Sequence, residues 1–194
     1  MKKTAGILLF LVCVSGTSGC GYNRLQTLDE GVKAAWAEVE SQYQRRHDLI
    51  PNLVEVVKGY AKHERETLNA VVSARARATE TKIQFNSLGD TQAFAKFREA
   101  QQGLSQALSR LMVVVEKYPD LKANENFRDL QSQLEGTENR ITVARKRYID
   151  SVADYNVMVR HFPTNLTAKY LLHLGLRETF SAAAGAKEVP QVKF

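Results

Sequence analysis

Cysteine is almost absent from this chain of 194 residues, which contains only Cys13 and Cys20. Cys13 lies within an apolar stretch near the N-terminus, ahead of a candidate cleavage site, so a processed chain keeps Cys20 alone. A single cysteine forms no internal disulfide and supplies neither a cysteine-based zinc site nor a thiol redox pair. Stability therefore has to come from a hydrophobic core, for which this length is sufficient.

Proline is scarce as well. The chain contains four prolines, at positions 51, 119, 163 and 190. The long stretches between them are rich in Ala, Leu, Glu, Gln, Lys and Arg, which are the strongest helix-forming residues. This composition predicts an all-α protein.

A hydrophobic run long enough to cross a bilayer is also missing. The apolar stretch from Ala5 to Val14 supplies about half of the roughly 20 residues that a spanning helix needs. Lys2 and Lys3 precede this stretch, and small residues at 16–19 follow it. This order is typical of an export signal, so we expect residues 1–19 to form a signal peptide.

The residues at the end of this signal, Thr17-Ser18-Gly19-Cys20, resemble a bacterial lipobox, although Thr17 stands where leucine is usual. The resemblance implies that Cys20 is acylated, becomes the new N-terminus and attaches the chain to the lipid bilayer. We therefore expect a lipid-anchored protein of the bacterial cell envelope that faces the periplasm or the exterior. Gly21 carries no inner-membrane retention acid, which favours the outer membrane in a Gram-negative cell. An ordinary secretory signal and an uncleaved short anchor stay open as alternatives.

Strong net charge is lacking too. The whole chain carries +6, and removal of residues 1–19 takes away two lysines and no acid, which leaves +4. Basic and acidic residues alternate along the expected helices, as solvated helix faces do, and form no basic stripe. We therefore expect no nucleic-acid partner.

The second half of the chain has a regular seven-residue spacing of apolar residues, which predicts two helices with one buried seam each. From Asp90 to Tyr118 the seam contains Phe94, Phe97, Gln101, Leu104, Leu108, Leu111, Val115 and Tyr118. From Leu121 to Phe162 the large seam residues are Phe127, Leu134, Ile141, Tyr148, Tyr155 and Phe162, which we expect in the core.

The first half keeps one seven-residue frame from Leu25 to Tyr60, but Pro51 interrupts it. A proline inside a helix removes a hydrogen bond and costs about 3 kcal/mol or more. We therefore expect the chain to fold back near Asp48 to Pro51. Residues 20–163 then form an antiparallel up-and-down four-helix bundle with long helices, with loops at 87–90 and 118–120. The alternative is three long helices, the first kinked at Pro51. Residues 164–194 read as a weakly helical segment and an extended tail, whose last residues, 189–194, alternate like an edge strand.

Several blocks of this sequence resemble the LemA family over nearly the whole processed chain. They include Ala35-Trp36, Arg45-Arg46-His47-Asp48-Leu49-Ile50-Pro51-Asn52-Leu53-Val54, Tyr118-Pro119-Asp120-Leu121-Lys122-Ala123-Asn124, Leu134-Glu135-Gly136-Thr137-Glu138-Asn139-Arg140-Ile141 and Asp154-Tyr155-Asn156. The family blocks after Phe162 are present only in part. The resemblance implies a membrane-attached helical bundle that faces away from the cytoplasm, and it implies no established reaction.

Residue patterns of bundle enzymes are missing. A di-metal carboxylate site needs Glu-x-x-His pairs, and no glutamate lies three residues before His47, His63, His161 or His173. His63-Glu64 lacks the second histidine of a zinc protease. Glu135 and Glu138 share a helix face, but arginines follow them, which favours a structural ion network. We therefore predict no catalytic, cofactor or metal residues.

Polar residues before Pro51 are the main candidates for binding. If the chain folds back there, a tip far from Cys20 presents Arg45, Arg46, His47 and Asp48, together with Tyr118 and Asp120, to an envelope partner. The simpler alternative is that Asp48 caps the following helix. A second hypothesis places Arg46, Gln42, His63 and Gln101 in a polar layer of the core, with Glu135 or Glu138 as partner.

These observations favour a non-enzymatic scaffold or protein-interaction module. An accessory or binding protein for an envelope enzyme or an acidic polymer is the alternative, and a hydrolase is the third. The identity of the partner protein and the oligomeric state do not follow from the sequence.

Overall fold

The computed structural model of the protein describes residues 2–84 and 87–180, with side chains from residue 21 onward. The described part is helical and contains no strand, which confirms the all-α prediction. Its elements are α1 (Lys2–Tyr60), α2 (Arg65–Glu80), α3 (Thr91–Val115), α4 (Pro119–Ala123), α5 (Glu125–Arg160), α6 (Thr164–Leu166) and the π-helical turn η2 (Thr167–Leu171).

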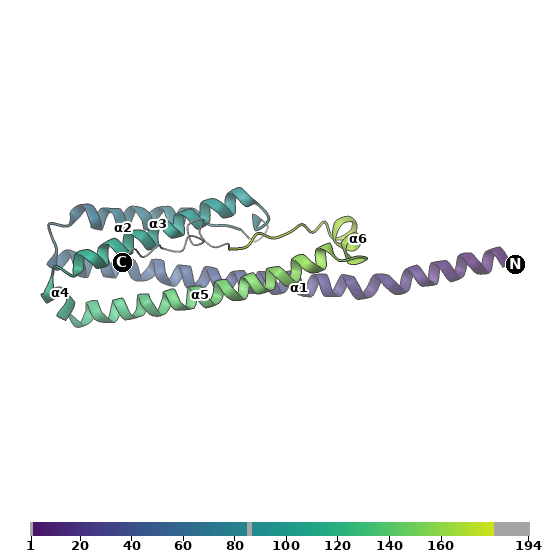
Figure 1. Cartoon of the computed structure of the whole chain (residues 1–194), viewed down its shortest axis with the longest axis horizontal. Helices are drawn as coiled ribbons and strands as arrows, with labels where there is room; N and C mark the ends of the chain where they lie inside the picture. The colour runs from purple at the N-terminus through teal and green to yellow at the C-terminus, as the bar shows by residue number, and fades with distance from the viewer. Residues whose placement is uncertain (1, 85–86, 181–194) are drawn as a thin grey trace, which may run out of the picture.

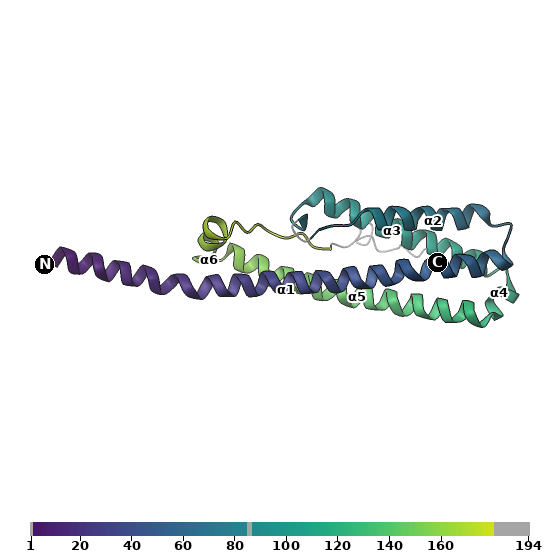
Figure 2. The same ribbon diagram turned by 180° about the vertical axis from the view of Figure 1, so that it is seen from behind.

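The four longest helices alternate in direction and form two antiparallel pairs (Figures 1 and 2). α1 packs along α5, and α2 packs along α3 beside the far part of α1. From residue 21 to its end α1 is about 60 Å long, and α5, with 36 residues, is about 54 Å long. These two lengths match, so α5 covers the part of α1 that follows residue 20.

The predicted fold-back at Asp48–Pro51 is wrong, because α1 continues through Pro51 as one helix. The hydrogen bond that the proline removes is replaced from outside the helix: Nε of Arg75, on α2, donates to the carbonyl of His47 at 2.8 Å. The alternative of three long helices, the first kinked at Pro51, is also wrong, since the chain turns between Tyr60 and Arg65 and α2 is a separate helix.

The core consists of two clusters along the bundle. The first lies between the far part of α1 and helices α2, α3, α4 and α5, and contains residues such as Leu53, Val71 and Leu111. The second is largely aromatic and is built around Trp36, whose ring lies 5.2 Å from that of Tyr148 and 5.5 Å from that of Phe97, between ring centroids. Offset aromatic pairs at this spacing are favourable and hold α1, α3 and α5 together.

Most of the predicted seam residues are in this core. Seven of the eight seam residues predicted between Asp90 and Tyr118 lie in α3 and are buried, and Tyr118, beyond its end, is half-buried. In α5 the large seam residues are buried from Phe127 to Tyr155. Phe162 is the exception. The structure corrects its assignment to the core, because the side chain is 72% exposed. It lies two residues after the end of α5, outside the seam that the helix buries.

The C-terminal segment after η2 returns along the bundle without regular structure. The hydroxyls of Tyr155 and Tyr148 donate to the carbonyls of Gly175 and Glu178, at 3.0 and 2.8 Å. Phe180 closes the aromatic cluster, 5.0 Å from the ring of Phe94. The predicted edge strand at 189–194 lies outside the described residues.

The part of the bundle nearest the N-terminus begins at Gly21. Gly21 is buried, and a Cβ atom built there would lie 2.6 Å from Cγ2 of Thr164, so only glycine lets α1 approach α6 this closely. No helix within the described part of the chain is long and apolar enough to cross a membrane. The side chains of residues 1–20, which carry the predicted signal and the predicted lipidation site Cys20, lie outside the described residues.

Candidate functional site: an arginine-lined pocket

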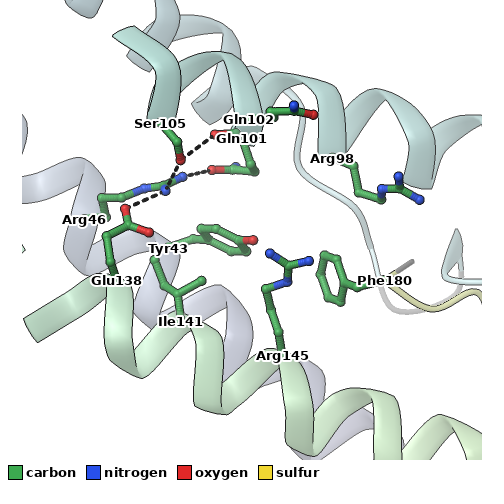
Figure 3. A pocket seen from close by; sticks show the side chains of 10 residues that line it. All are labelled: Tyr43, Arg46, Arg98, Gln101, Gln102, Ser105, Glu138, Ile141, Arg145 and Phe180. Atoms are coloured by element: carbon green, nitrogen blue, oxygen red, sulfur yellow. Dashed lines mark hydrogen bonds and ion pairs between the residues drawn. The ribbon is translucent and has the colours of Figure 1, made fainter. Parts of the chain in front are cut away.

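A pocket of about 290 Å³ opens halfway along the bundle, between α1, α3, α5 and the returning C-terminal segment (Figure 3). Its walls contain three arginines and one carboxylate, together with apolar and amide groups. The lining residues are Tyr43, Arg46, Arg98, Gln101, Gln102, Ser105, Glu138, Ile141, Arg145 and Phe180. The formal charge of this lining is positive, which suits an anionic group.

Arg46 forms the inner wall of this pocket and is almost completely buried. Its Nη1 donates to Oε1 of Glu138 at 2.8 Å and to Oγ of Ser105 at 3.1 Å, and its Nη2 donates to Oε1 of Gln101 at 2.5 Å. Gln101 in turn donates to the carbonyl of Ala78, at the end of α2. A buried charge is tolerated only when it is paired and hydrogen-bonded, and these contacts join all four long helices through one guanidinium.

Arg145 and Arg98 line the pocket from α5 and α3 and are more exposed than Arg46 (Figure 3). The Arg145 guanidinium lies 4.4 Å from the centroid of the Phe180 ring, a cation–π arrangement. Burial raises the pKa of the nearby Tyr43 hydroxyl, and this effect outweighs the opposing charges of Arg145 and Arg46. Tyr43 therefore stays neutral, and the pocket can offer both a hydroxyl and guanidinium donors to an acceptor.

One hydrogen-bond donor of Arg46 is not used. Its Nε is buried and has no hydrogen-bond partner among the residues that the structure describes. A buried donor of this kind costs free energy until an acceptor reaches it. An acceptor bound in the pocket is one way to satisfy it.

His47 is the buried neighbour of Arg46 on the α2 side of α1. Its Nδ1 lies 3.5 Å from Oγ1 of Thr79, a contact at the long limit of a hydrogen bond. Burial, followed by the charge of Arg46, lowers the pKa of His47 from its usual 6.5 to about 4. The imidazole is therefore neutral at physiological pH and belongs to the helix packing.

The structure does not bring the six residues of the predicted tip together. Arg45, Arg46, His47 and Asp48 lie within α1, about three turns before its end, and two of them are buried. Asp48 caps no helix, since it accepts a hydrogen bond from Gln44, one turn earlier on the same helix. This placement corrects both predictions for this segment, because each of them required a turn at Pro51.

Tyr118 and Asp120 do lie at the end of the bundle far from the N-terminus, where α4 follows α3. The Tyr118 hydroxyl donates to Glu64 at 3.1 Å, and the Asn124 amide donates to the hydroxyl of Tyr60 at 3.0 Å. These bonds tie the two turns of this end together. The tip therefore consists of residues 60–64 and 118–124.

The predicted polar layer is partly right. Arg46, Gln101 and Glu138 form this layer. Glu138 is one of the two acidic partners that the sequence offered. Gln42 is half-buried, whereas His63 and Glu135 are exposed and lie outside it. Glu135 instead accepts a bond from Gln131 on its own helix.

Sequence reasoning missed Arg98, Arg145 and Ser105 as members of the site. These residues lie beside the seam positions, not on them, and their neighbourhood depends on how α3 and α5 are rotated about their axes. The position of Gln101 in the buried seam was the available signal for this site, because a polar residue in a seam needs partners from the facing helices.

Within the described ranges no three or more His, Cys, Asp or Glu side chains gather in a way that could hold a metal ion.

The fold and this site define a class: long antiparallel helical bundles with a polar network in the core and an open basic pocket. A model of the LemA family matches residues 35–194, which is most of the chain. The protein therefore belongs to the LemA family, as the resemblance of its sequence blocks indicated. No curated protein matches the chain.

Proposed function

We propose that this LemA-family protein is a lipoprotein of the bacterial cell envelope, anchored through an acylated Cys20, that acts as a non-enzymatic protein-interaction module. The lipobox-like residues before Cys20 support the anchor. The packing of Gly21 on Thr164 supports an attachment without a linker, because the residue after the cysteine already contacts α6. The bundle then stands out from the membrane, with α6 near the bilayer and the tip at residues 60–64 and 118–124 farthest from it.

The observation that carries the interaction role is the arginine-lined pocket. Arg46, Arg98 and Arg145 line it together with one carboxylate, Glu138, which is ion-paired with Arg46. Guanidinium groups bind carboxylates through paired hydrogen bonds, so the pocket suits an acidic side chain of a partner protein. Ile141 and Phe180 add an apolar wall, which favours a peptide segment over a repeating polyanion.

Capture from intact envelopes tests this role. The protein with Arg98→Glu and Arg145→Glu should keep its helix content and its membrane attachment but lose its captured partners. The matched control is Arg110→Glu with Arg140→Glu, since these arginines are exposed on the same two helices but do not line the pocket. This control changes the charge equally and should retain more partner than the double pocket variant. Equal recovery by both variants would contradict the use of the pocket.

The second candidate function is binding of an acidic envelope polymer, which the same positive lining favours. The two functions differ in salt dependence. Polymer binding relies on many exposed charges and falls steeply with added salt, whereas a peptide in a half-enclosed pocket is screened much less. Titration of a purified partner at increasing salt therefore distinguishes the two candidates.

A further inference from the structure

Exposed apolar side chains are concentrated in the segment that follows α5. Phe162, Tyr170 and Leu171 are 72%, 68% and 64% exposed, and Leu166 is also exposed. Two basic residues are exposed beside them, Arg160 at the end of α5 and Lys169 within the segment. We call these six residues the base patch. Single exposed apolar residues are normal, but four within ten residues indicate a surface that a membrane or another molecule covers.

The base patch lies beside the start of the bundle. Thr164, between its residues, packs on Gly21, and α1 contacts both α6 and η2. Figures 1 and 2 show α6 next to α1 at the level where α1 leaves the other helices. The patch is therefore adjacent to the residue that follows Cys20, at the end opposite to the tip.

The charge of this segment has one sign. Between Asp154 and Glu178 the chain contains no acidic residue, whereas Arg160 and Lys169 are exposed. The Lys169 ammonium lies 5.4 Å from the centroid of the Tyr170 ring, so an aromatic ring and a cation are presented together. Tyrosine with lysine or arginine is the combination found where a protein meets lipid headgroups, and anionic headgroups attract the cations.

We propose that the base patch is a membrane-contact surface, which seats the bundle on anionic phospholipid. Phe162, Leu166, Tyr170 and Leu171 enter the headgroup region, and Arg160 and Lys169 bind phosphate groups there. A bilayer is favoured over a protein partner because the patch lies beside Gly21, next to the proposed point of membrane attachment. The proposal rests on the proposed anchor at Cys20, which brings this end of the bundle to the bilayer.

Tryptophan quenching by brominated phospholipid tests the proposal in the full chain. The protein has one tryptophan, Trp36, which is buried in the aromatic cluster and gives an unquenched background. Tyr170→Trp adds a reporter to the base patch. Val113→Trp adds one to an equally exposed site near the far end of α3. The chain is reconstituted in vesicles of phosphatidylethanolamine and phosphatidylglycerol that carry bromine in the upper acyl chain.

The expected result is about a twofold loss of the added fluorescence for Tyr170→Trp, with little loss for Val113→Trp. Equal quenching at the two sites, or none at either in protein that floats with the vesicles, would overturn the membrane contact and leave the anchor intact. Protein that fails to float would overturn the anchor and the contact together.

Charge reversal tests the headgroup contacts separately. In the Tyr170→Trp protein, Arg160→Glu with Lys169→Glu should reduce quenching on anionic vesicles and leave it unchanged on phosphatidylcholine vesicles. The control pair, Arg140→Glu with Lys146→Glu on the exposed face of α5, should leave both values unchanged. Unaltered quenching of the patch variant on anionic vesicles would refute the contacts of the two cations with phosphate.

Discussion

Replacement of Glu138 by alanine leaves a buried guanidinium without its counter-ion and should destabilise the protein. Arg46 is 1% exposed, and Glu138 is its salt-bridge partner at 2.8 Å. Removal of one member of a fully buried pair costs about 3–5 kcal/mol. The Glu138 side chain is 44% exposed, so water replaces part of the lost contact, and Gln101 and Ser105 still accept from Arg46. We therefore expect a loss of about 2 kcal/mol in the free energy of unfolding.

A double-mutant cycle with Arg46→Leu isolates this effect. In the Arg46→Leu protein no buried charge is left, so Glu138→Ala should then cost less than about 0.5 kcal/mol. Urea denaturation followed by far-ultraviolet circular dichroism measures all four proteins. The exposed pair of Lys146 and Asp150 is the control, and Asp150→Ala should change stability by less than about 0.5 kcal/mol. A coupling energy near zero between Arg46 and Glu138 would refute the assigned role of the ion pair.

Three further predictions concern other parts of the bundle. The folded-state pKa of His47 is lowered to about 4, so below about pH 6.5 the unfolded chain binds more protons than the folded chain. The free energy of unfolding should therefore decrease as the pH is lowered. Between pH 7 and 5 the loss should be about 2 kcal/mol larger in the wild type than in His47→Gln, and equal pH slopes in urea denaturation would contradict it. Arg75→Met should lower the free energy of unfolding by about 1–2 kcal/mol because the His47 carbonyl loses its donor. In the Pro51→Ala protein, which has the helical N–H again, the same change should cost less. Equal costs in the two proteins would argue that Arg75 does not replace the missing helix bond. Gly21→Ala should lower the free energy of unfolding by about 1–2 kcal/mol through its contact with Cγ2 of Thr164, and Thr164→Ser, which removes that methyl group, should restore stability; failure of this rescue would contradict the assigned contact.

The helices and their buried seams were predictable because apolar spacing is a local property of the chain. The frame from Leu25 to Tyr60 placed Val32, Val39, Arg46 and Leu53 on one face, and all four are buried. The same spacing predicted the partnership of Arg46 with Gln101 and with one of two glutamates, which the structure shows to be Glu138. The family followed from the sequence blocks that resemble it. Polar residues on a seam have to find partners across it, which makes such partnerships predictable.

The position of the first turn was not predictable from Pro51 alone. A proline inside a helix is unfavourable in isolation, and its cost is reduced here by Arg75, which is 24 positions later in the sequence. The better signal was a shift of the apolar phase after Tyr60, since three of the four buried residues of α2, Leu68, Val71 and Ala78, lie off the α1 frame and only Ala74 continues it. The predicted tip at residues 45–48 failed with the fold-back on which it depended.

The C-terminal segment shows another limit of local reasoning. Phe162 continues the seven-residue spacing of α5, but the helix ends at Arg160 and no neighbour covers the ring. Phe180, in a segment without regular structure, fills the aromatic cluster instead. Contacts of this kind depend on the path of the chain after the helix, which spacing does not encode.

Mass spectrometry of the N-terminal peptide of the protein purified from membranes tests the central claim most directly. The claim is that the bundle is attached to the bilayer at the residue before Gly21. It predicts a chain that begins at Cys20, with a diacylglycerol on the Cys20 sulfur and no trace of residues 1–19. A chain that begins elsewhere, or that carries an unmodified Cys20 thiol, would contradict the anchor and the orientation of the bundle derived from it.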